Sequence, residues 1–296
     1  MPVRVLPALL IIGASFLFSS HALAQALPAS VPPTPTAPVQ TVELDQTVVN
    51  VPTTMPLKRH KSYFKITHRF ARDLRRGSLG QLAEDAFSLD NGAIIGLEYR
   101  FALTSSLQAG LHRSILGKTI ETFAKWDVRS QSAGLPVGLS VAASLEGQNN
   151  LHLDPQPGIS ATISRMHGTW LALYAAPTYI HNAHTATLRL GHDHGTGANA
   201  AVDDEIPGAD STDTAFIGLG MRARVRETVS LVAEVSPRIA GYRPDRAAWN
   251  IGVEKLTRGH VLQLNFGNNF DSTPGMVARG GSPHDIYMGF NMSRKF

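Results

Sequence analysis

Apolar and polar side chains alternate with a period of two from residue 58 to the C-terminus. The alternation predicts β-strands, because successive side chains of a strand point to opposite faces of a sheet. No stretch of this region reaches the run of about 18 apolar residues that a membrane-spanning helix requires. The clearest segment places apolar residues on one face and polar or small residues on the other: Ala93, Ile95, Leu97, Tyr99 and Phe101 against Gly92, Gly96, Glu98 and Arg100.

The alternating segments predict an all-β fold, an antiparallel transmembrane β-barrel of about twelve strands. Most segments have the ~9–11 residues with which a tilted strand crosses a bilayer, whereas strands of soluble sheets more often have about 5–6. Segment length therefore favours a membrane barrel over a soluble sandwich. The predicted strands are 61–70, 91–101, 105–115, 118–131, 134–146, 157–166, 169–181, 213–225, 228–237, 247–256, 259–268 and 284–296.

The connections between these strands alternate between short and long. Barrels of the bacterial outer membrane have short periplasmic turns and longer outer loops. An even strand count then places both ends of the barrel in the periplasm. Gly117, after the third strand, is the exception, because it makes a short connection on the outer side. The short connections are 102–105, 132–133, 167–168, 227–228 and 256–259, and the long ones are 71–90, 147–156, 182–212, 238–246 and 269–283.

The last predicted strand ends at an aromatic residue, Phe296. An alternating terminal strand closed in this way resembles the signal read by the outer-membrane assembly machinery, so we expect that machinery and outer-membrane lipid as partners. Arg294 departs from the pattern, since its face otherwise carries apolar residues. Its position near the chain end lets the side chain reach the membrane interface.

The N-terminal residues 1–24 have the three zones of a secretory signal peptide: Arg4, an apolar run over 5–18, and a small-x-small site before Gln25. The run is shorter than the about 20 residues of a membrane anchor. Residues 25–57 are rich in Pro and Thr, which predicts an extended periplasmic linker before the barrel domain, 58–296. Alternatively, the Val/Thr stretch 42–51 pairs with the edge of a partner's sheet.

The face opposite the apolar one is rich in charge of both signs. If the apolar face meets lipid, these side chains face the lumen, where they either line a narrow hydrated pore or pair across it and close it. The solvated face of a soluble sheet is the remaining interpretation. The candidate lumen residues are Lys65, Arg69, Glu98, Arg100, Glu121, Lys125, Asp127, Arg129, Arg222, Arg224, Glu234 and Glu254.

The densest cluster of possible metal ligands lies in the longest outer loop, where imidazoles and carboxylates suit a divalent ion such as zinc. The alternative is a solvated loop, because the spacing of His192 and His194 is not that of a helical zinc motif, and exposed loops with several such residues are commonly only solvated. The candidate ligands are His181, His184, His192 and His194, with Asp193, Asp203, Asp204 and Glu205 nearby.

No motif predicts catalysis or a cofactor. The chain has no Cys, which excludes thiol nucleophiles and Cys-ligated metals. Ser140, Ser160 and Ser230 have no His at a spacing that suggests a catalytic triad. Nucleotide-binding loops are absent, and a formal charge of +4, or +3 after loss of Arg4, gives no support to nucleic-acid binding.

The stretch 92–129, GAIIGLEYRFALTSSLQAGLHRSILGKTIETFAKWDV, and the preceding YFKITHRF at 63–70 resemble a family of exported outer-membrane β-barrel proteins without an assigned activity. The resemblance covers the body of the chain after the linker. It implies a barrel fold and an outer-membrane location, and it implies no site residues.

The leading functional expectation is a passive, porin-like channel in the bacterial outer membrane with a mixed-charge lumen, and not an enzyme. The alternative is a closed barrel that acts as a structural or interaction platform through 71–90, 182–212 and 269–283. A soluble exported barrel is the rival at the level of fold. It requires an apolar interior and a polar exterior, the inverse of the faces described above.

Overall fold

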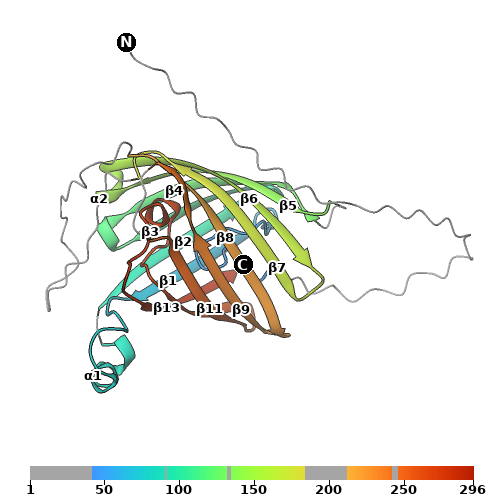
Figure 1. The fold of residues 1–296 in the computed structure, drawn as a ribbon. Helices are drawn as coiled ribbons and strands as arrows, with labels where there is room; N and C mark the ends of the chain where they lie inside the picture. Colours follow the sequence, from blue (N-terminus) through green and yellow to red (C-terminus); the bar gives the residue numbers. More distant parts are fainter. Residues whose placement is uncertain (1–41, 91, 132–134, 184–211, 242–245) are drawn as a thin grey trace, which may run out of the picture. The chain divides into compact units, whose positions relative to one another are not determined.

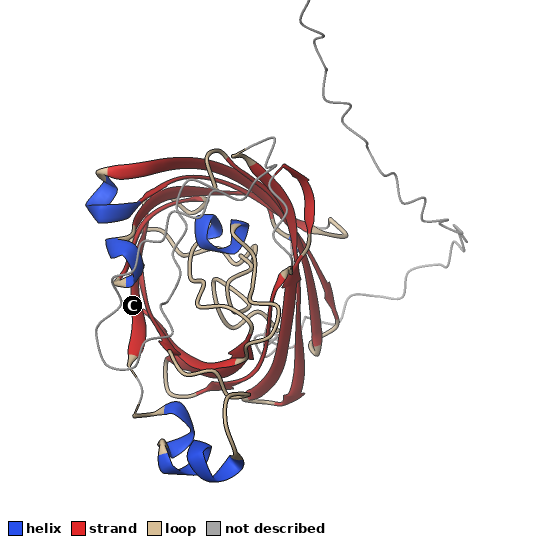
Figure 2. Ribbon diagram, turned by 60° about the vertical axis from the view of Figure 1, so that its left-hand side comes forward, coloured by secondary structure: helices blue, strands red, loops and turns tan. Residues whose placement is uncertain are grey.

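The computed structural model describes residues 42–90, 92–131, 135–183, 212–241 and 246–296. In these ranges the strands form one antiparallel sheet that closes on itself (Figures 1 and 2). Apart from β10, which pairs with β8, each strand pairs with its neighbours in chain order, β9 with β8 and β11, and the first strand also pairs with the last. The strands are β1 (Ser62–Phe70), β2 (Ala93–Ala102), β3 (Leu107–Ser114), β4 (Ile120–Arg129), β5 (Gly138–Gly147), β6 (Leu153–His167), β7 (Leu171–Ile180), β8 (Thr214–Arg226), β9 (Val229–Ser236), β10 (Arg238–Gly241), β11 (Ala248–Leu256), β12 (His260–Gly267) and β13 (Tyr287–Lys295).

Strands β9 and β10 are two parts of one barrel strand. Pro237 separates them and has no N–H with which to continue the ladder, yet its carbonyl accepts a hydrogen bond from Ile217 N at 3.0 Å. Both parts pair with β8. The barrel therefore has twelve strands, which confirms the predicted fold class.

The two faces of the sheet have opposite chemistry. Gln108 and Glu254 on the inner face are both 0% exposed. A broad apolar outer surface is typical of a wall that meets lipid, and the pairing of a polar interior with it excludes the soluble barrel with an apolar lumen. The exposed outer residues include Leu97, Tyr99, Leu111, Trp126, Ile159, Leu173, Leu231, Ile251, Leu264 and Phe290.

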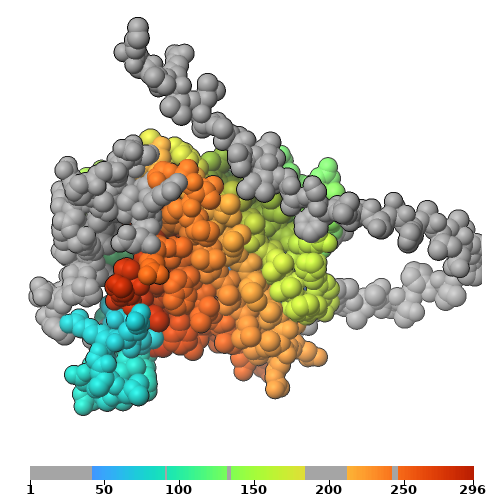
Figure 3. Space-filling view, viewed as in Figure 1, coloured from blue at the N-terminus to red at the C-terminus, as the bar shows by residue number. Residues whose placement is uncertain are grey.

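Short turns join the strands at one end of the barrel, the short-turn end, and the opposite end is the long-loop end. The long-loop end carries α1 (Leu79–Glu84), η1 (Ala86–Ser88), η2 (Leu116–Lys118), α2 (Gln148–Leu151) and α3 (Pro274–Ala278). Helix α1 begins with a capping box, in which the side chains of Ser78 and Gln81 each accept a hydrogen bond from the other's backbone N–H. The α1 loop, cyan in Figure 3, projects from the barrel wall. No helix of the described residues is long and apolar enough to span a bilayer.

The chain end closes β13 against β1. Phe296 N donates to Ser62 O at 2.9 Å. Arg294 is exposed, as its outward register predicts, and its guanidinium carbon lies 5.0 Å from the centroid of the Phe296 ring. This contact places the charge at the short-turn rim of the apolar wall.

Candidate functional site

The strands turn nine of the twelve candidate lumen residues inward as buried side chains. Asp127 and Arg224 are half-buried, and Arg129 is exposed. A register shift between Asp127 and Arg129 in the pairing of β4 with β5 takes Arg129 out of the alternation. Side chains of an open aqueous pore remain accessible to water, so the interior around these residues is filled. The buried nine are Lys65, Arg69, Glu98, Arg100, Glu121, Lys125, Arg222, Glu234 and Glu254.

Residues 42–57, which we call the plug, fill the barrel from the short-turn end (Figure 2). The prediction that 25–57 is a periplasmic linker is wrong for this part, because Val48 and Val49 are 0% exposed inside the barrel. Residues 25–41 lie outside the described residues. The plug makes a tight hairpin, in which Val48 N donates to Val51 O at 2.8 Å and Thr53 N to Gln46 O at 2.9 Å.

The tip of the plug hairpin is bound by one carboxylate of the wall. Glu234 accepts hydrogen bonds from the backbone N–H groups of Val49, Asn50 and Val51 at 3.0, 2.9 and 2.9 Å. The Asn250 side chain donates a fourth at 3.0 Å. Successive N–H groups that converge on one anion bind it strongly, because each hydrogen bond is charge-assisted.

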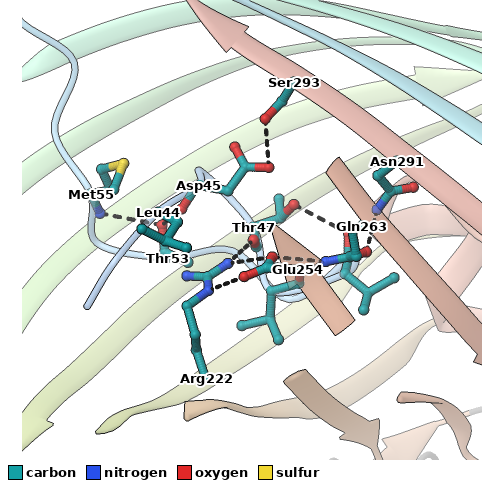
Figure 4. A network of polar contacts seen from close by, with 12 residues as sticks. Leu44, Asp45, Thr47, Thr53, Met55, Arg222, Glu254, Gln263, Asn291 and Ser293 are labelled. Atoms are coloured by element: carbon teal, nitrogen blue, oxygen red, sulfur yellow. Dashed lines mark hydrogen bonds and ion pairs between the residues drawn. The ribbon is translucent and has the colours of Figure 1, made fainter. Parts of the chain in front are cut away.

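Donors of the wall bind the plug carbonyls (Figure 4). Arg222 donates to Thr47 O at 2.8 Å and pairs with Glu254 through two hydrogen bonds of 2.6 and 2.9 Å. Gln263 donates to Val48 O at 2.6 Å. Three lysines also donate hydrogen bonds to plug carbonyl oxygens. They are Lys65 to Val49 O at 2.9 Å, Lys125 to Met55 O at 2.8 Å and Lys295 to Leu44 O at 3.0 Å.

Glycines of the wall leave the space that the plug side chains occupy. A Cβ atom at Gly220 would lie 2.9 Å from Val48 Cγ2, and one at Gly218 would lie 3.0 Å from Val51 Cγ2. Larger side chains at these two positions would therefore displace the plug. The apolar side of the plug completes one cluster with the wall: Val42, Val48, Val49 and Val51 with Ala172, Tyr174, Ala176 and Val232.

The connection between β12 and β13, residues 268–286, folds into the long-loop end. We call it the cap. It carries α3, which lies inside the ring of strands in Figure 2. Met276 packs with Ile94 and Leu116, and Val277 and Ala278 pack in a second apolar cluster with the wall. Glu146 accepts a hydrogen bond from Gly275 N at 3.1 Å and pairs with Arg279 at 3.4 Å. This outer loop, predicted as part of an exposed platform, is thus largely buried.

One cap carboxyl is perturbed by its surroundings. Burial raises the pKa of Asp271 to about 7, against the opposing charges of Arg279, Arg238 and Arg69. Its Oδ2 atom is buried without a hydrogen-bond partner. The cap therefore contains an acid that changes charge near neutral pH.

Of the predicted metal ligands, only His181 is described, and His184, His192 and His194 lie outside the described residues. Nδ1 of His181 lies 2.8 Å from Asp213 Oδ1. Partial burial acts to raise the pKa of Asp213, but hydrogen bonds from Tyr179 and Asn182 and the nearby His181 hold it below its usual value. No group of three metal-ligating residues occurs in the described part of the chain, and metal binding in this loop stays a prediction.

The sequence pattern identified the charged inner face but missed the plug. The one sequence feature that could have indicated the plug is the Val/Thr-rich stretch at the end of the Pro-rich segment. Such a stretch is compatible with a β-hairpin as well as with an extended linker. The contact between Val49 and Glu234 joins residues 185 positions apart, and no local pattern reports such a contact.

The family model described as "Membrane bound beta barrel domain (DUF5777)" matches residues 44–296, so the match begins within the plug. No curated protein sequence matches the chain. Among solved structures, a KdgM porin aligns with a TM-score of 0.48 and 7% identity over 80% of this chain and 99% of that chain. A NanC porin aligns with a TM-score of 0.48 and 6% identity over 80% and 100%. A variant porin of Rhodopseudomonas blastica aligns with a TM-score of 0.34 and 12% identity, over 72% of this chain and 58% of that chain.

Proposed function

The chain belongs to the family of membrane-bound β-barrel domains, and we propose that it is a bacterial outer-membrane channel whose mixed-charge lumen is closed at rest by the plug. The observation that carries the proposal is the chemistry of the surface that holds the plug. Glu234 accepts from plug amides, and five donors bind plug carbonyls: Lys65, Lys125, Arg222, Gln263 and Lys295. Water satisfies all of these groups once the plug leaves, so the same wall serves both the closed and the hydrated state.

Barrel width supports the same proposal. An eight-stranded barrel is filled by its own side chains, whereas barrels of about 16–18 strands enclose an aqueous channel. Twelve strands leave space that side chains alone do not fill, and here polypeptide fills it. Withdrawal of the plug leaves a narrow lumen with charges of both signs, and in this proposal the cap stays in place and narrows the long-loop end.

A disulfide lock tests the proposal. The chain has no Cys, and a Cβ atom at Gly220 would lie 3.5 Å from the Cβ atom of Val48. This separation is within the range of about 3.5–4.5 Å found in disulfides. We expect Val48→Cys with Gly220→Cys to stop opening events in planar lipid bilayers when oxidised, and a reducing agent to restore them.

Each single-Cys variant and the parent chain are the controls, and a reducing agent should leave their conductance unchanged. A third variant replaces residues 45–53 by a Gly/Ser linker and should conduct persistently. Absence of conductance from this variant, in a barrel that still shows a heat-modifiable band on gels, would overturn the channel proposal.

The α1 loop supports a second candidate, a platform that binds a partner. Leu79, Phe87 and Leu89 are 83%, 57% and 58% exposed on this projecting loop. Crosslinking in intact cells tests it: replacement of residues 78–89 by a Gly/Ser linker should remove crosslinked partners while the barrel stays folded. Unchanged crosslinks would remove this candidate.

A further inference from the structure

Arg69 of β1 is a buried arginine whose guanidinium is held in one orientation. The side chain is 2% exposed. Its Nη1 donates to Asn291 Oδ1 at 2.7 Å and to the backbone carbonyl of His68 at 3.3 Å. Gly289, the β13 partner of Arg69, lets the side chain lie across that strand, since a Cβ atom there would come within 2.7 Å of Arg69 Cδ.

The other edge of this guanidinium is buried and unused. Nε and Nη2 of Arg69 donate no hydrogen bond. These two atoms form the side-on edge of the fork, which matches the two oxygens of a carboxylate. A buried ionised donor without an acceptor is costly, so an oriented and unused edge is a feature that needs an explanation.

The neighbouring carboxylates do not neutralise Arg69. In the described part of the chain, no carboxylate lies within ion-pairing distance of it. The two carboxyl groups whose charges act on Arg69 are Glu234, which is occupied by the plug amides, and Asp271 of the cap, which forms no ion pair with it. Lys65, on the same face of β1, adds positive charge and binds the plug.

The surroundings of Arg69 are polar and lie between the plug and the cap. On the same inner wall, His112 of β3 is 1% exposed, and neither ring nitrogen has a hydrogen-bond partner. Its ring leans over Gly96 of β2 towards Thr67 of β1, because a Cβ atom at Gly96 would lie 2.8 Å from His112 Nε2 and 2.4 Å from Thr67 Oγ1. A polar solute at Arg69 would therefore meet further polar groups of the wall.

We propose that the side-on edge of Arg69 is a binding subsite for a carboxylate-bearing solute inside the lumen. The inference rests on the proposed function, and it names the class of solute that the channel would carry. Nε and Nη2 donate to the two carboxylate oxygens while Asn291 keeps the guanidinium in place. The solute is thus held by a bidentate, charge-assisted pair of hydrogen bonds.

A chain of hydrogen bonds links this subsite to the plug. Asn291, which orients Arg69, donates to Gln263 Oε1 at 2.7 Å, and Gln263 donates to Val48 O at 2.6 Å (Figure 4). Gln263 also donates to Glu254, the partner of Arg222, at 2.8 Å. Arg69 is consequently oriented by residues that also hold the plug.

The test measures binding without conduction. The folded full-length chain in detergent micelles is heated in sodium succinate or in sodium chloride at equal ionic strength, and unfolding is followed by the loss of the heat-modifiable band. We expect succinate to raise the unfolding midpoint of the parent chain saturably, because a ligand that binds only the folded state stabilises it by mass action. Arg69→Gln should abolish the saturable rise, and Arg69→Lys, which keeps the charge but not the fork, should raise the half-saturating concentration at least about tenfold.

Arg129→Gln is the matched control, since it removes the same charge from an exposed position and should behave like the parent chain. An equal response of Arg69→Gln and the parent chain, or a parent response that never saturates, would overturn the subsite. Should Arg69→Gln fail to fold, the comparison of Arg69→Lys with the parent chain decides. The channel proposal is tested separately. If the variant without the plug binds succinate through Arg69 but never conducts, the subsite stands and the channel proposal is overturned.

Discussion

The plug and the cap both fill the barrel, but the wall holds them by different means. The plug joins a strand of the barrel only through β1, and its backbone is bound by charged side chains such as Glu234 and Arg222. The cap joins β12 and β13 at its two ends, and it packs Met276, Val277 and Ala278 against apolar wall residues. Both elements bury apolar side chains against the wall, the plug through four valines, so apolar burial alone does not distinguish them. Water replaces the polar contacts of the plug backbone at little cost, and of the two elements the cap is the one attached to barrel strands at both ends. The plug is therefore the element suited to leave and the cap the element suited to stay.

Because the chain has no Cys, a single introduced cysteine can report on the opening of the plug or of the cap alone. Val51→Cys reports on the plug and Val277→Cys on the cap, since both positions are buried. The rate at which a thiol reagent modifies each one measures how often its element opens.

Removal of Arg222 should have the largest effect. Arg222→Ala leaves Glu254 buried without its partner and frees Thr47 O, so we expect a loss of about 3–5 kcal/mol in the free energy of unfolding. Urea titration followed by tryptophan fluorescence measures it. The double variant Arg222→Met with Glu254→Leu is the matched control and should lose less, because no charge is left unpaired. A larger loss in the double variant would show that charge pairing is not what holds this part of the wall.

Removal of Glu234 should release the plug without the cap. Glu234→Ala leaves three plug amides and Asn250 without their acceptor, so we expect about 2 kcal/mol less stabilisation of the bound plug, or roughly thirtyfold faster labelling of Val51→Cys. Labelling of Val277→Cys should stay unchanged. Equal acceleration at both reporters would mean that plug and cap open together, which would break the comparison.

A cavity in the cap should have the converse effect. Met276 is 1% exposed and packs with Ile94 and Leu116. Met276→Ala should destabilise the cap by about 2 kcal/mol, the low end for such truncations, because a loop can relax into the space more readily than a paired strand. Labelling of Val277→Cys should accelerate while labelling of Val51→Cys does not. Met276→Leu, which nearly conserves volume, is the control.

The smallest effect should come from pH. Burial raises the pKa of Asp271 in the folded protein to about 7, above the 3.8 of an ordinary Asp. Neutral Asp271 therefore stabilises the cap fully below pH 3.8, and this stabilisation is lost as the pH rises through about 7. Between pH 5 and 8 we expect labelling of Val277→Cys to accelerate a few-fold relative to a thiol at exposed Leu79. The effect is smaller than the full difference between the two pKa values would give, because local opening at Val277 hydrates the carboxyl of Asp271 only in part. Asp271→Asn should remove the acceleration, and a pH profile unchanged by this substitution would exclude Asp271 as its cause.

The strands could be predicted closely because each is specified by its own residues. The predicted segments 61–70 and 259–268 became β1 (Ser62–Phe70) and β12 (His260–Gly267), and every predicted strand has a counterpart. The inward direction of Arg222 and Glu254 followed from the same alternation. The bulge that exposes Arg129 could not be predicted, because a register shift depends on the partner strand.

The sequence by itself determined a twelve-stranded barrel with an apolar outer wall and a charged interior, since a period of two assigns side chains to faces wherever the strands lie. Only the tertiary structure decided what the charged interior binds. Two examples are the hydrogen bond from Val49 N to Glu234 and the edge of the Arg69 guanidinium that donates no hydrogen bond. Both depend on residues far apart in the chain, which only barrel closure brings together. Local patterns report which way a side chain points, and the closed fold determines what it meets.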